Sequence, residues 1–516
     1  MTDFSLLRYY APSEKRDKPE RVQADLCIYG GSPAGIAAAV QASRMGLKAV
    51  IAEFGQHLGG LTASGLGRTD FGHKTSLGGI AKEFYQKLGR HYGSDEPEGT
   101  AWFMEPHVAE RIFTEWVEQA GVPVYYGQHL SGVEKQNGKI VQITMENGNV
   151  FRAEAFIDAT YEGDLFARAG VSYHVGREAN EVHKETWNGI QFGSPWHTFK
   201  AWVDPFVKEG KPDSGLLYGV SDAAPGIQGQ GDRSIQAYNF RICLTDVPDN
   251  RVAFPAPPGY DPGKFALLSR YLQAGVWDAL TLHKPMPNGK TDLNNFGAVS
   301  TDHIGANHAW PEADYAERER IFQEHVHYNL GMLHFLANDE SVPEPVRREV
   351  SRWGLPADEF TSTANWPHYL YVREGRRMIG EVVMNQNHCL KYLKAEDSVG
   401  LASYGMDSHN CRRIVLDGRC VNEGDVEIPV SGPYPISYRS IVPKGNECTN
   451  LLVPVCLSSS HIAYGSIRME PVFMVLGQSA ATAAALALRD GRAVQDVDYA
   501  LLRKQLLQDG QTLDVQ

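Results

Sequence analysis

One segment near the start of the chain combines a strand, a glycine-rich turn, a helix, a second strand and an acidic residue in a fixed order. The apolar run 26–29 predicts a buried strand, and the turn Gly30–Gly35 follows it directly. Pro33 suits the first position of the alanine-rich helix that comes next. The second apolar run ends in Glu53, eighteen residues after the turn. This order is typical of a nucleotide site. Glycines let the backbone approach a pyrophosphate, the helix N-terminus favours its negative charge, and the acid can bind ribose hydroxyls.

Length and composition limit the class of protein. A chain of 516 residues is too long for one ordinary core, so we expect two or three domains. The net charge of −13 argues against nucleic acid or an anionic membrane as a partner, because both require a basic face. Seven cysteines without a C-x-x-C pair suit reduced, buried thiols. The polar N-terminal stretch lacks the pattern of a signal peptide, so we expect a cytoplasmic protein.

The pattern of strands and helices changes twice along the chain. Residues 25–170 and 446–490 alternate between strand and helix signals, whereas 171–445 is irregular and holds most of the Pro, Trp and His residues. We therefore predict an α/β fold in which a Rossmann-like nucleotide-binding domain of three layers (ββα) carries an inserted α+β substrate domain. The predicted parts are an N-terminal tail at 1–24, the nucleotide-binding domain at 25–170 and 446–490, the insertion at 171–445, and a C-terminal helix or tail at 491–516.

Four further segments show a clear helix or strand pattern. We predict helices over 106–121 and 312–338, a buried helix starting at Pro471, and a strand over 236–243. On that strand Asn239 and Arg241 would share one face and could form the floor of a pocket, but the pattern favours a purely structural strand.

The turn alone does not distinguish NAD from FAD. Only one such turn is present, because the glycines at 226–231 have no apolar strand before them. Several separated segments also suit a long cofactor, and both features favour FAD. The segments 29–35, 59–65, 157–165, 371–378, 407–409 and 457–471 together resemble the bacterial FAD-dependent oxidoreductases of the glutathione-reductase-like flavoprotein superfamily, over nearly the whole chain beyond residue 24.

This resemblance implies a set of FAD-binding residues and a possible homodimer. The turn and the acid would hold ADP, a second glycine loop would follow the ribityl chain and flavin, and two later segments would pass the cofactor. One position departs from the family pattern: Ser32 stands where G-x-G-x-x-G has its second glycine, and its hydroxyl could donate to phosphate. The implied residues are Gly30, Gly31, Ser32, Pro33, Ala34, Gly35 and Glu53, then Gly59, Gly60 and Thr62, then Ala159 and Thr160, and finally Arg468, Met469 and Pro471.

Three side chains are candidates for the chemistry. His461 follows a Ser-rich loop after a strand and could take a proton from a substrate; the alternative is a histidine bonded to backbone. His409 is a second candidate, with Asp407 either orienting it or capping a turn. Arg373 lies four residues before Arg377, as on one helical face, and arginine would suit a substrate carboxylate; the alternative is internal pairing with Glu374 or Glu381.

Other patterns are absent or weak. His325, His327 and His334 lie on a helical stretch without an H-E-x-x-H motif, so we predict no metal site. The leading functional prediction is an FAD-dependent oxidoreductase that transfers hydride from a small polar substrate, with a sugar-derived alcohol as first candidate, to flavin and then to an unknown electron acceptor. The alternatives are reduction or desaturation of a carbon–carbon bond in a carboxylic acid, and a non-catalytic binding protein that retains the flavoprotein fold.

Overall fold

The computed structural model describes residues 4–283 and 285–514. Its central feature is one mixed sheet in the order β3-β2-β1-β6-β5-β4, with β17 also paired to β6. β1 lies between β2 and β6 in parallel register, and β17 joins the same parallel set from the other end of the chain. The strands of this sheet are β1 (Arg21–Tyr29), β2 (Ala49–Ala52), β3 (Val124–Tyr125), β4 (Leu130–Gln136), β5 (Lys139–Met145), β6 (Val150–Asp158) and β17 (Leu451–Leu452).

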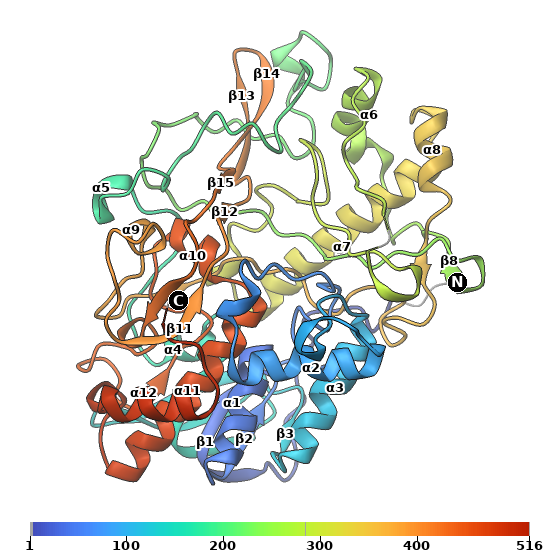
Figure 1. Ribbon diagram of the computed structural model, residues 1–516. Helices are drawn as coiled ribbons and strands as arrows, with labels where there is room; N and C mark the ends of the chain where they lie inside the picture. Colours follow the sequence, from blue (N-terminus) through green and yellow to red (C-terminus); the bar gives the residue numbers. More distant parts are fainter. Residues whose placement is uncertain (1–3, 284, 515–516) are drawn as a thin grey trace.

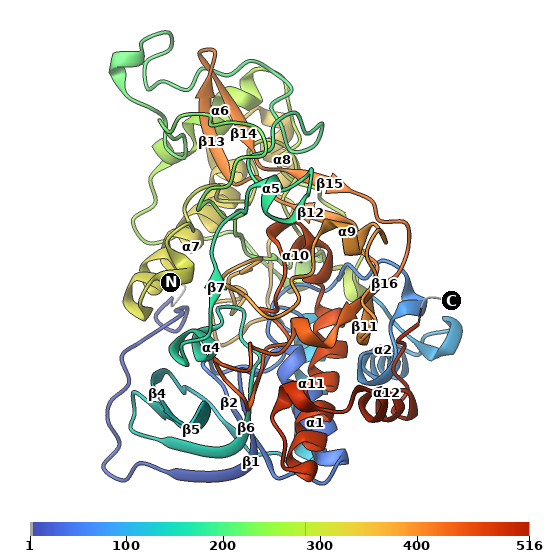
Figure 2. The same cartoon turned by 90° about the vertical axis from the view of Figure 1, so that its left-hand side faces the viewer.

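The two ends of the chain build this layered part together. In Figure 1 the blue and red segments form the lower half of the molecule, while the green and yellow middle of the chain lies above them. Figure 2 shows helices α1 (Pro33–Arg44) and α11 (Glu470–Asp490) side by side. The helices of this part are α1 (Pro33–Arg44), α2 (Gly79–Tyr92), α3 (Pro106–Gln119), α4 (Asp164–Arg168), α10 (His461–Ile467), α11 (Glu470–Asp490) and α12 (Tyr499–Gln508).

Small residues allow α1 and α11 to pack closely. A Cβ added to Gly477 in α11 would come within 2.1 Å of the Ala34 carbonyl oxygen in α1, so the two backbones nearly touch. α11 is long and apolar enough to cross a membrane, yet 94% of its most apolar 18-residue stretch is buried inside the protein. The prediction of a buried helix in this region is therefore confirmed. All seven cysteines are also buried and free, as the sequence predicted.

The middle of the chain contains little regular sheet. Within its described residues the strands form only two-stranded antiparallel ladders, β7–β10, β8–β9, β11–β16, β12–β15 and β13–β14. The elements are β7 (Tyr173–His174), α5 (Asn180–His183), β8 (Arg251–Val252), α6 (Ala266–Gln273), α7 (Tyr315–Asn338), α8 (Glu344–Val350), β9 (Leu355–Pro356), β10 (Arg377–Met378), α9 (Gln386–Cys389), β11 (Ser398–Ala402), β12 (Met406–Ser408), β13 (Arg412–Leu416), β14 (Arg419–Glu423), β15 (Val426–Ile428) and β16 (Tyr434–Ser437).

Two predicted boundaries and one predicted strand differ from the structure. The long helix α7 begins at Tyr315 rather than at 312, because the Asp314 side chain accepts from the Glu317 amide and caps it. The predicted tail is shorter, since β1 already starts at Arg21. The predicted strand over 236–243 is wrong: its backbone makes only isolated bridges, and side chains on both of its faces are buried. The division into domains stays a prediction.

A buried ion cluster joins the layered part to the middle of the chain. Asp164, the first residue of α4, accepts from Arg318 at 2.6 and 2.9 Å and from Arg376 at 2.7 Å. Burial acts to raise the pKa of Asp164, but the two guanidinium groups outweigh it and hold the pKa well below its usual range. The carboxylate therefore stays charged and provides a shared counter-charge to two buried cations.

We expect Asp164→Asn to lower the free energy of unfolding by about 3–5 kcal/mol, because it leaves two buried guanidinium groups without a counter-charge. The measurement is chemical denaturation of the flavin-bound protein. Glu20→Gln is the matched control, since the Glu20 side chain is 46% exposed and its partner Arg16 is also exposed. Equal denaturation midpoints for Asp164→Asn and Glu20→Gln would contradict the prediction.

Candidate cofactor and substrate site

The glycine-rich turn brings the start of α1 against the end of β1. Gly30 adopts φ +105°, and a Cβ on Gly35 would lie 2.0 Å from the Gly30 carbonyl oxygen, so this position requires glycine. Ser32 is the N-cap of α1: its Oγ accepts from the Gly35 amide at 3.4 Å and donates to the Ala159 carbonyl at 2.6 Å. The predicted donation from Ser32 to phosphate is therefore replaced by a contact within the protein. The amides of the first helical turn are the groups left for an anion.

Glu53 lies buried directly beneath this turn. Its carboxylate accepts from the Gly31 amide, from the Gly55 amide at 2.6 Å and from the Tyr369 hydroxyl at 2.8 Å. Burial raises the pKa of Glu53, and these donors only partly oppose it. A Cβ on Gly31 would lie 2.5 Å from Leu58 Cδ2 and 2.9 Å from Glu53 Oε2, so only a hydrogen atom fits there.

The second glycine loop is tied to the first turn. The Gly59 amide donates to the Gly31 carbonyl at 2.8 Å, and both Gly59 and Gly60 have positive φ. A Cβ on Gly60 would meet the Tyr161 hydroxyl at 2.3 Å. Tyr161 follows Ala159 and Thr160 at the end of β6, so the structure brings together the first three groups of residues that the sequence predicted to bind the cofactor.

The fourth predicted group, 468–471, is connected to the other three through the Glu470 side chain. The Tyr161 hydroxyl donates to its two carboxylate oxygens at 3.0 and 3.1 Å, and Thr62 Oγ1 donates at 3.4 Å. Pro471 stands next to Glu470 in the first turn of α11, and Arg468 and Met469 directly precede it. Burial raises the pKa of Glu470 to about 8, so the side chain is neutral at pH 7.

We expect Glu470→Gln to remove a pH dependence of stability. The pKa of Glu470 lies near 8 in the folded protein and about 4.3 in an unfolded chain. The stability that the protonated side chain contributes is complete below the unfolded value and declines as the pH rises towards 8. Between pH 5 and 8 the native chain should therefore lose about 1.4 kcal/mol of unfolding free energy per pH unit that the variant does not lose. The difference in unfolding free energy, variant minus native, increases by the same amount. Denaturation of the flavin-saturated proteins at several pH values measures this difference, and parallel curves would contradict it.

A cavity of about 550 Å³ opens beside Glu53. Its wall includes Phe54 and Gly55 next to the acid, and the aromatic side chains of Tyr126 and Tyr369. Aromatic faces beside a buried carboxylate suit the base and ribose of an adenosine. Together with the glycines, where an added Cβ would have no room, this chemistry fits FAD. None of the residues that the sequence predicted to hold FAD lines this cavity, so their assignment to the cofactor stays a prediction.

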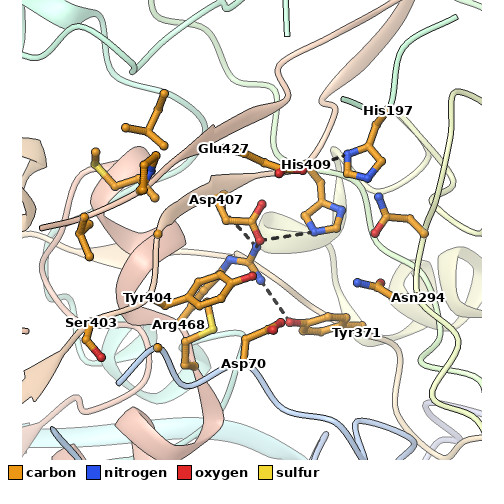
Figure 3. A pocket seen from close by; sticks show the side chains of 18 of the residues that line it. Asp70, His197, Asn294, Tyr371, Ser403, Tyr404, Asp407, His409, Glu427 and Arg468 are labelled. Carbon is orange, nitrogen blue, oxygen red and sulfur yellow. Dashed lines mark hydrogen bonds and ion pairs between the residues drawn. The ribbon is translucent and has the colours of Figure 1, made fainter. Parts of the chain in front are cut away.

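A second cavity, also about 550 Å³, lies where the middle of the chain meets Arg468 and Met469. We call it the substrate cavity; Figure 3 shows its side chains. Asp407 lies between two of them, 3.4 Å from Arg468 Nη2 and 3.9 Å from His409 Nε2. Its wall also includes the polar side chains of Asp70, His197, Arg241, Asn294, Tyr404 and Glu427.

His409 is held as a neutral imidazole that faces this cavity. Its Nδ1 lies 2.7 Å from Asp302 Oδ2. Because a carboxylate there accepts the Nδ1 proton, the lone pair of Nε2 points towards Asp407 and the cavity. Burial and the nearby Arg373 lower the pKa of His409, despite the two carboxylates. Asp302, 107 positions earlier in the chain, therefore orients this histidine in place of the predicted Asp407.

Arg373 is buried behind the cavity wall and does not line it. It contacts Asp302 at 3.0 Å and Asn239 at 3.0 Å, and its guanidinium lies 4.5 Å from the centre of the Tyr371 ring. The predicted helical face shared with Arg377 is wrong, since the segment is extended and Arg377 opens β10. Arg377 pairs internally with Glu374, which was the alternative reading of this pattern.

His461 is also buried away from the cavity wall. It is the first residue of α10, capped by Ser460, rather than part of a loop. Its Nδ1 lies 2.7 Å from Glu374 Oε2, and its Nε2 lies 3.0 Å from Ser408 Oγ. Burial, with Arg377 and Arg177, lowers the pKa of His461 to about 3. This geometry shows a satisfied buried histidine, and a chemical role for it stays a prediction.

The sequence identified part of the cavity wall and missed the rest. Arg241 does line the cavity, whereas Asn239 lies behind it on Arg373. Asp70, His197, Asp302 and Glu427 were not predicted. No local pattern marks them, because they come from loops and short strands that are far apart in the chain.

Comparison with known proteins gives the family. The family model described as FAD dependent oxidoreductase matches residues 25–506. A search of curated proteins finds no match. Solved structures resemble parts of the chain. One is OxyS anhydrotetracycline hydroxylase from Streptomyces rimosus, with 15% identity, coverage of 31% of this chain and 36% of that chain, and a TM-score of 0.23. Another is L-proline dehydrogenase from P. horikoshii, with 14% identity, coverage of 31% and 59%, and a TM-score of 0.25.

These structural matches span less than two thirds of the other chains. The family model, in contrast, covers nearly the entire chain, including all the residues that line the substrate cavity. The chain therefore belongs to the family of FAD-dependent oxidoreductases, with FAD as its cofactor.

Proposed function

We propose that this protein oxidises a small hydroxyl-bearing substrate in the substrate cavity, with a sugar-derived alcohol as first candidate. The observation that carries the proposal is the neutral His409, oriented by Asp302, on the wall of a polar cavity that ends at Arg468 and Met469. FAD, when bound, supplies the acceptor for the hydride that leaves the substrate carbon.

The side chains have distinct parts in this reaction. His409 Nε2 accepts the proton of the substrate hydroxyl as the carbon–hydrogen bond breaks and the carbonyl forms. The Asp302 carboxylate then stabilises the imidazolium, and Arg373 holds that carboxylate in place. Asp407 and Arg468 provide an acceptor and a donor for the other polar groups of the substrate.

A second candidate reaction is desaturation or reduction of a carbon–carbon bond in a carboxylic acid. The feature that favours it is Arg241. Its Nε and Nη2 donate to Asp292, whereas its buried Nη1 makes no hydrogen bond with the described residues. A guanidinium with a spare donor at a cavity wall suits a carboxylate.

Anaerobic titration of the flavin-bound protein tests both reactions. We expect the visible absorbance of the bound flavin to bleach with sugars or sugar alcohols. If only saturated carboxylic acids bleach it, or if unsaturated acids reoxidise the reduced protein while no alcohol reacts, the second reaction replaces the first. A protein that takes up no FAD would instead support a non-catalytic binding protein. Membership of the glutathione-reductase-like superfamily, a bacterial source, the cytoplasmic location and the homodimer stay predictions from the sequence.

A further inference from the structure

Among the described residues, three clusters combine histidine with carboxylates closely enough to hold a metal ion. Two of them are unsuitable. In the first, Lys290 Nζ already fills the space between Glu105 and Glu359, at 2.8 and 2.7 Å, beside His107. In the second, the rings of His57 and His368 are stacked 3.5 Å apart and nearly parallel. An ion shared by stacked rings would lie outside both ring planes, whereas the lone pair of an imidazole lies in its plane.

The third cluster has neither defect. We propose that His197, Asp425 and Glu427 bind a divalent cation at the rim of the substrate cavity. His197 Nδ1 lies 2.8 Å from Asp425 Oδ2 and 3.6 Å from Glu427 Oε1. Ligand bonds of 2.0–2.2 Å at tetrahedral or octahedral angles place neighbouring ligand atoms about 2.8–3.6 Å apart. The two observed separations lie at the ends of this range, so small side-chain rotations are sufficient to admit an ion.

Groups around the cluster fix two of the three ligands. The Ser194 hydroxyl donates to Asp425 Oδ1 at 2.6 Å, which leaves Oδ2 directed at His197. His197 has φ +49°, an uncommon conformation for a residue with a side chain, and its carbonyl accepts from Asn410 at 3.1 Å and Asn422 at 2.9 Å. Strained backbone that is held by its surroundings is typical of ligand sites, and second partners of this kind orient metal ligands.

The charge of the neighbouring strands provides an independent argument. In the β12–β15 ladder Asp407 stands directly opposite Glu427. Like charges at opposite positions destabilise a strand pair. Arg468 compensates the negative charge of Asp407. His197 is the ion-pair partner of both Asp425 and Glu427. A divalent cation would balance these two carboxylates.

The ligand types indicate the class of ion. One imidazole and two carboxylates suit a first-row divalent ion such as Zn²⁺ or Mn²⁺, whereas Mg²⁺ favours oxygen ligands alone. His197 and Glu427 both line the substrate cavity, and Figure 3 shows them at its edge beside His409. The open coordination positions therefore face the cavity. A substrate oxygen would complete the coordination there, and this last step alone rests on the proposed function.

The test uses the flavin-bound protein without substrate. The protein is first treated with a chelator and then dialysed against Mn²⁺ or Zn²⁺. Mass spectrometry measures its metal content. The electron paramagnetic resonance signal of free Mn²⁺ measures the affinity for that ion. We expect one bound ion per chain. Asp425→Asn and Glu427→Gln should each lose it with unchanged flavin content. Ser194→Ala should weaken Mn²⁺ binding about 10–100-fold, because it removes only an orienting partner.

His107→Gln is the matched control, since its cluster is filled by Lys290, and it should bind the ion as the native chain does. A native protein that binds no ion, or an Asp425→Asn variant with native affinity, would overturn the proposal. An ion that binds while no substrate reduces the flavin would support the metal site and count only against the proposed reaction.

Discussion

Replacing Gly31 with valine should give a folded protein without FAD. A Cβ at this position would lie 2.5 Å from Leu58 and 2.9 Å from the Glu53 carboxylate. The valine would therefore displace the acid and the loop that ends at Gly59, whose amide bonds to the Gly31 carbonyl. Since these groups form the expected phosphate and ribose site, cofactor binding should fall below detection. The measurement is the ratio of flavin to protein absorbance after purification and after incubation with added FAD.

Gly132→Val is the matched control for this variant. Gly132 lies in β4, and an added Cβ there meets no atom within 4 Å. Valine also suits a strand, so this protein should bind FAD fully. If Gly31→Val retained full flavin content, the assignment of the phosphate site to the first turn would be wrong.

Replacing His409 with glutamine should slow reduction of the flavin by about 10²–10⁴-fold without loss of FAD, because a positioned general base typically contributes this factor. Rapid-mixing measurements of flavin bleaching with a reactive substrate provide the rate. His461→Gln is the informative comparison, since that buried histidine is held by Glu374 and Ser408 away from the cavity wall. We expect its effect on the rate to be much smaller. Equal losses in both variants would remove the distinction between the two histidines.

Asp302→Asn tests whether Asp302 acts through His409. The charged groups facing this imidazole are Arg373, which lowers its pKa, and Asp302 and Asp407, which raise it. Loss of the Asp302 charge should lower the pKa of His409, so the acidic limb of the pH–rate profile should move to lower pH. A merely structural defect would reduce the rate without moving that limb.

The local parts of the nucleotide site could be predicted from the sequence. The tight turn at Gly30, the proline at the start of α1 and the proline at the start of α11 depend on residues within one or two turns of each other. Such signals are short-range properties of the backbone, so they persist in the folded chain. The apolar pattern of α11 likewise predicted its burial.

The substrate cavity was decided by tertiary structure. Residues 236–243 alternate like a strand, but a strand also requires a continuous neighbour, and the fold provides only isolated bridges there. Asp302 orients His409, and Asp425 meets His197, only because loops and short ladders from distant parts of the chain pack together. The sequence by itself determined the turn, the acid and the helices that prepare the cofactor site. Packing alone decided which polar side chains orient His409 and His197, because these contacts join residues more than a hundred positions apart.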